Sequence, residues 1–89
     1  MVANIHYFDS REDATFALEL LRDSIREYGY ATLYDYYILC GEKSLHELHK
    51  RIGWTDLKGS FVRGYDWPPY AGKYSIVFMT NPGPLKQNR

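Results

Sequence analysis

Two histidines in one helix-sized segment are candidate metal ligands. His46 and His49 stand three positions apart, so in an α-helix both rings lie on one face and offer two nitrogen ligands to a metal ion. A zinc site needs three or four ligands, and no other His, Cys or carboxylate follows at a supporting spacing. The His-Glu-x-x-His spacing of metalloproteases is also absent. A solvated helix is the preferred interpretation, and no metal or cofactor is predicted.

Residues for covalent or acid–base catalysis are equally sparse. Cys40 is the sole cysteine, so it forms no internal disulfide, and we expect a buried reduced thiol. The sequence has no Gly-rich phosphate loop, no nucleophile elbow and no carboxylate pair in an apolar frame. Asp56 follows Trp54-Thr55, and an Asp in such a turn usually accepts a hydrogen bond from its own backbone. The sequence therefore predicts that the protein is not an enzyme.

Aromatic and basic side chains gather in the segment 63–70, which is the strongest candidate for a protein contact. Interface hot spots favour Trp, Tyr and Arg. The four residues of these types are Arg63, Tyr65, Trp67 and Tyr70. Two adjacent prolines stiffen the segment, so exposed rings would lose little entropy on binding. The alternative is that Trp67 folds over the core as a lid. The favoured function is a non-enzymatic protein that occludes a site on a partner protein.

A second set of side chains supports a DNA-binding alternative. If residues 45–52 are the second helix of a helix-turn-helix, their polar side chains would meet a groove, and basic residues further along would contact phosphate. The residues of this set are His46, His49, Lys50 and Arg51 on the helix and Lys58, Arg63 and Lys73 beyond it. Glu47 and the formal net charge of zero weigh against this small winged-helix regulator.

Length and charge limit the organisation of the chain. Eighty-nine residues, 45% of them apolar, make one compact domain, expected over residues 1–80 with a flexible tail over 81–89. Residues 1–40 carry seven acidic and three basic side chains, and residues 41–89 carry four acidic and eight basic ones. This asymmetry favours an anionic partner for the second half, or a homodimer joined through opposite faces. No leader or membrane-length apolar run is present, which predicts a cytoplasmic protein without membrane contact.

Start and stop signals define three helix-sized segments that would position these candidates. A polar residue that favours an N-cap opens each segment, and a glycine ends it. The predicted pairs are Asp9 or Ser10 with Gly29, Thr32 with Gly41, and Ser44 with Gly53. The first segment carries an apolar stripe that repeats every three or four residues from Ala14 to Tyr28.

The remainder of the chain has the pattern of a β-hairpin. Residues 60–65 and 73–80 are predicted strands, and the prolines of the intervening loop remove backbone donors that a ladder would need. Residues 5–8 are expected to form an edge strand or an ordered arm. The predicted fold class is α+β: three short helices followed by an antiparallel β-hairpin, in a winged-helix arrangement.

Two patterns resemble a group of small uncharacterised phage and prophage proteins. The first is Tyr-Gly-Tyr at residues 28–30, followed by a helix that contains Asp35; the second is Gly-Trp-Thr-Asp-Leu at residues 53–57, followed by a strand. The resemblance covers about residues 12–65, and the chain departs from it in segment 42–52 and in the Trp-Pro-Pro loop. It implies a phage accessory context, in which small cytoplasmic proteins bind and redirect or inhibit host macromolecules. It brings no established activity.

Overall fold

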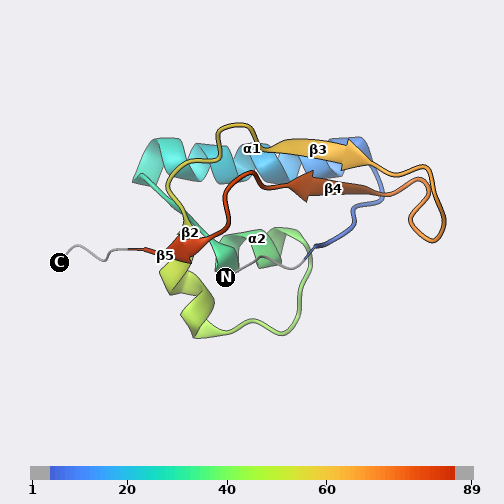
Figure 1. The fold of residues 1–89 in the computed structure, drawn as a ribbon. Helices are drawn as coiled ribbons and strands as arrows, with labels where there is room; N and C mark the ends of the chain where they lie inside the picture. Colours follow the sequence, from blue (N-terminus) through green and yellow to red (C-terminus); the bar gives the residue numbers. More distant parts are fainter. Residues whose placement is uncertain (1–4, 86–89) are drawn as a thin grey trace.

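The computed structural model describes residues 5–85, which form an α+β fold with two antiparallel sheets (Figure 1). The elements in chain order are the α-helix α1 (Arg11–Tyr28), the strand β1 (Ala31–Thr32), the α-helix α2 (Leu33–Leu39), the 3-10 helix η1 (Glu47–Arg51) and the strands β2 (Ile52–Trp54), β3 (Phe61–Gly64), β4 (Tyr74–Val77) and β5 (Gly83–Pro84).

Helix α1 begins and ends at residues that the sequence predicts. The Ser10 hydroxyl accepts a hydrogen bond from the Asp13 amide at 3.0 Å, so Ser10 is the N-cap. Gly29 ends the helix at φ 87°, and its N–H donates to the Ile25 carbonyl at 2.8 Å. The predicted apolar stripe is buried from Ala14 through Leu21, whereas Tyr28 is 68% exposed.

Helix α2 begins with the predicted capping box. The Thr32 hydroxyl accepts from the Asp35 amide at 2.9 Å, and the Asp35 carboxylate accepts from the Thr32 amide at 3.2 Å. The buried side of the helix carries Leu33, Tyr36 and Tyr37. The second predicted helix is therefore confirmed, with Gly41 in the left-handed region at φ 78° just after it.

The predicted third α-helix is wrong. Ser44 is exposed and lies in an irregular segment. The short helix η1 starts later, with His46 as its N-cap, and the His46 Nδ1 accepts from the Leu48 amide at 3.0 Å. Gly53 does not end a helix but lies in β2, between β1 and β5. A Cβ at Gly53 would stand 2.0 Å from the Ala31 carbonyl oxygen, so this close strand pairing needs glycine. Long-range strand pairing thus overrides the local helix signals.

Two small sheets organise the strands. In the sheet β1-β2-β5, Gly53 pairs with Thr32 on one side and Gly83 on the other. Strands β3 and β4 form the predicted antiparallel hairpin, although both strands are shorter than expected. Phe8 adds a single bridge to Tyr74 at the outer edge of β4, so the N-terminal segment lies against the hairpin.

The winged-helix arrangement is not confirmed. Helix α1 packs along both hairpin strands, and η1 lies on the far side of α2 from the hairpin (Figure 1). A wing normally flanks a recognition helix, but the segment before the hairpin holds the short 3-10 helix η1 and the strand β2. The reason is again strand pairing: residues 52–54 form β2 between β1 and β5 and so cannot extend a helix.

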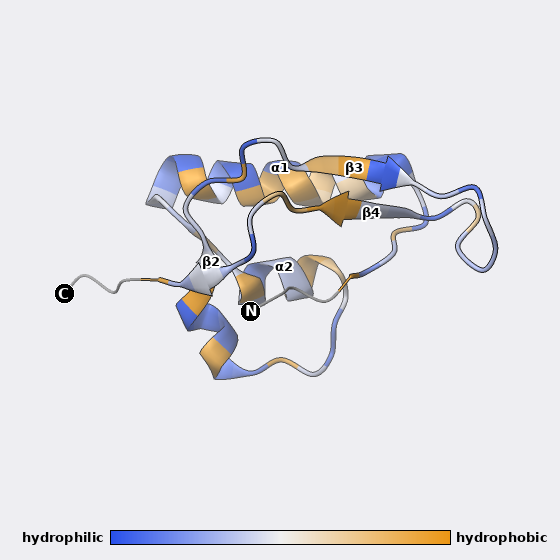
Figure 2. Ribbon diagram, viewed as in Figure 1, coloured by the Kyte–Doolittle hydropathy of each residue, from blue (hydrophilic) through white to orange (hydrophobic). Residues whose placement is uncertain are grey.

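Trp54 lies in the core that joins these elements. It is 2% exposed, stacks on Phe78 with ring centroids 4.4 Å apart, and meets the edge of Tyr36. Its indole N–H donates to the Thr80 carbonyl at 2.8 Å, so this buried donor is satisfied. Figure 2 shows hydrophobic residues in the middle of α1 and in β4, where helix and hairpin pack together.

The segment expected as a flexible tail begins with packed residues. Pro82 is fully buried, β5 pairs with β2, and the Leu85 amide donates to the Arg51 carbonyl at 2.8 Å. Residues 86–89 of the expected tail lie outside the described residues.

Candidate functional site

The loop between β3 and β4 is held by its own backbone. The Tyr65 amide donates to the Lys73 carbonyl at 3.1 Å, and the Gly72 amide donates back to the Tyr65 carbonyl at 3.0 Å. Within the loop, the Tyr70 amide donates to the Trp67 carbonyl at 3.0 Å. Gly72 adopts φ 81°, a conformation that favours glycine. These bonds fix the backbone from which the aromatic side chains of the loop project.

Three tyrosines form a cluster beside this loop. Tyr7 and Tyr70 stack with centroids 4.2 Å apart and planes 10° apart. Tyr65 presents its edge to both rings, at 5.5 Å from Tyr7 and 6.2 Å from Tyr70. Trp67 is 82% exposed, so the alternative in which it covers the core is wrong. We call Tyr7, Arg63, Tyr65, Trp67 and Tyr70 the hairpin patch.

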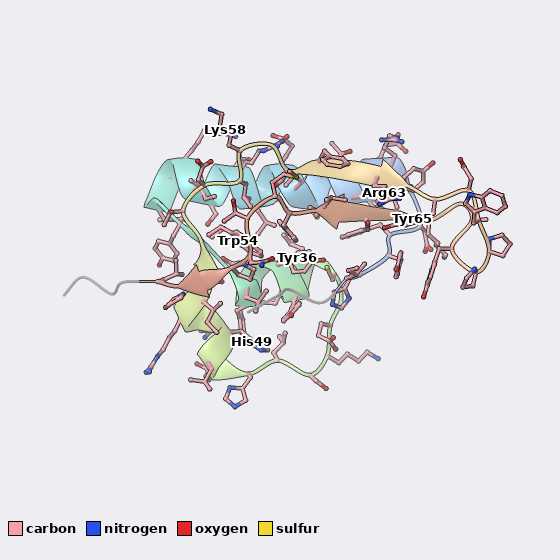
Figure 3. All side chains as sticks on the ribbon, viewed as in Figure 1. Tyr36, His49, Trp54, Lys58, Arg63 and Tyr65 are labelled. Atoms are coloured by element: carbon pink, nitrogen blue, oxygen red, sulfur yellow. The ribbon has the colours of Figure 1, made fainter. Side chains whose placement is uncertain are left out.

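Arg63 adds a positive charge to the hairpin patch. Its guanidinium carbon lies 5.3 Å from the centre of the Tyr65 ring, within cation–π range. Within residues 5–85, no ion pair joins Arg63 to a carboxylate. Figure 3 shows Arg63 and Tyr65 at the same end of the hairpin. The Tyr65 hydroxyl lies 2.9 Å from the Ser75 hydroxyl, and this hydrogen bond orients the ring.

Sequence reasoning missed Tyr7, which comes from the N-terminal segment. Backbone bonds join Phe8 and Tyr74 in both directions, at 2.7 and 3.0 Å, and hold this segment beside β4. The Asp9 carboxylate also pairs with the Lys73 ammonium, which lowers the pKa of Asp9. Partial desolvation, followed by the neighbouring Tyr70 and Tyr65, raises the pKa of Tyr7. The sequence offered one signal, the expectation that residues 5–8 form an edge strand or an ordered arm.

Three of the four residues predicted for DNA contact at η1 make contacts within the protein, whereas Arg51 is exposed. The Lys50 ammonium lies 3.4 Å from the Glu47 carboxylate and 4.7 Å from the centre of the Tyr34 ring. His49 packs edge-on against Tyr37 at 5.0 Å, and His46 caps η1 through its ring nitrogen.

The remaining basic residues of that set are scattered. Figure 3 shows Lys58 and His49 on opposite sides of the molecule, with Arg63 toward a third region at the end of the hairpin. Lys73 pairs with Asp9. The Lys58 amide donates to the Asp56 carboxylate at 2.8 Å, which is the backbone bond expected for Asp56 in its turn. Of the predicted protein-contact residues, the structure gathers Arg63, Tyr65 and Tyr70 around one loop. The four predicted DNA-contact residues at η1 also stay together, but Lys58 and Arg63 lie away from them.

Reactive groups do not assemble in the described part of the chain. Burial raises the pKa of the Cys40 thiol to about 12, so the thiol is protonated at neutral pH. No three His, Cys, Asp or Glu side chains among residues 5–85 could hold one metal ion.

Among the concave surfaces of the described residues, two adjoin the aromatic side chains described above. A cavity of about 240 Å³, which we call the hairpin cavity, opens beside the hairpin patch and shares Arg63 and Tyr65 with it. A larger groove of about 590 Å³ runs between α1 and α2, with the exposed rings of Tyr28 and Tyr30 and the side chain of Ile38 at its surface.

Comparison with known proteins found no matching family model, and neither curated proteins nor solved structures gave a significant match to the chain. None of the helices in residues 5–85 has the length and apolar character needed to cross a bilayer. The functional argument therefore rests on the surfaces described above.

Proposed function

We propose that this protein is a non-enzymatic phage accessory protein that binds a host or phage protein through the hairpin patch and blocks what that partner normally binds. One observation carries the proposal. Trp67 is 82% exposed in a loop fixed by backbone hydrogen bonds, and the same loop carries Tyr70, which stacks on Tyr7.

Physical reasons favour a binding role for such a loop. A large apolar ring in water is unfavourable for an isolated monomer, and its transfer into a partner pocket recovers the hydrophobic free energy. Because the loop backbone is already fixed, little conformational entropy is lost on association. Trp, Tyr and Arg are also the residue types that dominate interface energetics. The phage context rests on the resemblance of residues 12–65 alone.

The DNA-binding alternative has less support. Its recognition helix would be the five-residue 3-10 helix η1, in which Lys50 pairs with Glu47. Its basic residues also point to several sides of the molecule, so few phosphates could be neutralised at once.

Affinity capture from host lysate with the Trp67→Ala variant tests the proposal. Loss of a hot-spot Trp costs 2 kcal/mol or more, so we expect the variant to bind a captured partner at least about 30-fold more weakly. Tyr28→Ala is the matched control, because Tyr28 is 68% exposed outside the hairpin patch. Retention by Trp67→Ala of every partner that the unaltered protein captures would overturn the proposal. Thermal unfolding of both variants checks that the fold is intact.

A further inference from the structure

The hairpin cavity has the size and walls of a receptor for one side chain. Its volume of about 240 Å³ is below that of pockets for drug-sized molecules. Its walls come from segments far apart in sequence: the N-terminal segment, α2, the face of the hairpin and the turn after β4. The apolar side chains that define it are Ile5, Tyr36, Ile76, Val77, Phe78 and Pro82.

The charge at the cavity is uncompensated. Arg63 lines the cavity and is 5.3 Å from the Tyr65 ring, and no acidic residue is among the described residues that line it. Lys73, two positions before Ser75 of the cavity wall, is already paired with Asp9. A guanidinium forms two parallel hydrogen bonds with a carboxylate, a geometry that Arg63 does not use within residues 5–85.

The cavity is continuous with the hairpin patch. Tyr65 belongs to both, since its ring packs against Tyr7 and Tyr70 while its hydroxyl bonds Ser75 on the cavity wall. A partner chain that covers the exposed Trp67 therefore passes close to the cavity opening. Figure 3 shows Arg63 and Tyr65 between the centre of the molecule, where Tyr36 and Trp54 lie, and the tip of the hairpin.

From these three observations, we propose that the hairpin cavity binds an apolar side chain of the partner protein, from a segment in which an Asp or Glu adjoins that residue. The apolar side chain fills the cavity, and the carboxylate pairs with Arg63. This inference rests on the proposed function, because it names the partner segment that the same surface recognises.

Two blocked dipeptides test the inference without a known partner. The probes are N-acetyl-Leu-Asp-amide and its neutral isostere N-acetyl-Leu-Asn-amide, titrated to millimolar concentration into ¹⁵N-labelled protein. We expect the acidic probe to shift amide signals of Arg63 and of residues 75–78. The neutral probe should bind at least about threefold more weakly, as for a partly exposed ion pair.

Matched variants separate this inference from the proposed function. Arg63→Gln should abolish the difference between the probes, Arg63→Lys should keep part of it, and Lys58→Gln should leave it unchanged. Trp67→Ala should still bind the acidic probe, because Trp67 does not line the cavity. Equal affinity of the two probes, shifts that map to the α1–α2 groove, or no shifts at all would overturn the inference. None of these results would alter the Trp67 dependence of partner capture.

Discussion

At Gly53, the addition of a single methyl group should strongly destabilise the fold. A Cβ there would meet the Ala31 carbonyl oxygen at 2.0 Å and the Thr32 Cα at 2.8 Å, both backbone atoms that cannot rotate away. We predict that Gly53→Ala lowers the free energy of unfolding by about 3 kcal/mol, the cost of overpacking at a rigid site. Urea unfolding followed by tryptophan fluorescence measures the change.

The matched control for that substitution is its neighbour in the same sheet. Gly83 pairs directly with Gly53, and a Cβ at Gly83 would meet nothing within 4 Å. Gly83→Ala should therefore change the free energy of unfolding by less than about 1 kcal/mol. Similar losses for both substitutions would contradict the role assigned to the close approach of β1 and β2.

Residue types predicted part of the candidate site because four of its members are near neighbours in the chain. Arg63, Tyr65, Trp67 and Tyr70 lie within one hairpin, so the local pattern was enough to group them. Tyr7 joins them from more than fifty positions away, and the hairpin cavity draws on four separate segments. Composition and periodicity carry no information on such distant neighbours.

At the scale of elements, two serines with similar sequence signals have different roles. Ser10 caps α1 through its hydroxyl, whereas Ser44 is exposed before η1. Ser10→Ala should lower the free energy of unfolding by about 1 kcal/mol, the usual cost of losing an N-cap. Ser44→Ala should change it by less than about 0.5 kcal/mol. Chemical unfolding monitored by far-UV circular dichroism compares the two variants. An equal loss of unfolding free energy in both would contradict the different roles of Ser10 and Ser44.

The two α-helices could be predicted because their sequence signals are local. Caps and apolar spacing act within a few residues, and they identified α1 and α2. Strands β1 and β5 have two residues each, too few to show any alternation, and they form only because β2 lies between them. The segment 44–52 was misassigned because its local capping pattern was stronger than any sign of that distant pairing.

For the whole molecule, charge predicts weak attraction to nucleic acid. The formal net charge is zero, and Lys50 and Lys73 are paired with carboxylates. We expect no salt-sensitive binding to mixed-sequence duplex DNA at moderate ionic strength, because few counterions would be released. Fluorescence anisotropy at low and moderate salt measures this. Salt-sensitive binding that is lost in a Lys50→Ala/Arg51→Ala double variant would instead support the DNA-binding alternative.

The order of strands in the sheet β1-β2-β5 has a consequence for synthesis on the ribosome. As the chain emerges, β2 can pair with β1 early, but its second edge stays open until residues 83–84 have left the exit tunnel. Thr80, which accepts the indole N–H of Trp54, and the buried Pro82 also arrive late. If the chain folds as it emerges, it therefore passes through a stage with an unpaired strand edge beside an incompletely covered core, which is the kind of surface that promotes aggregation.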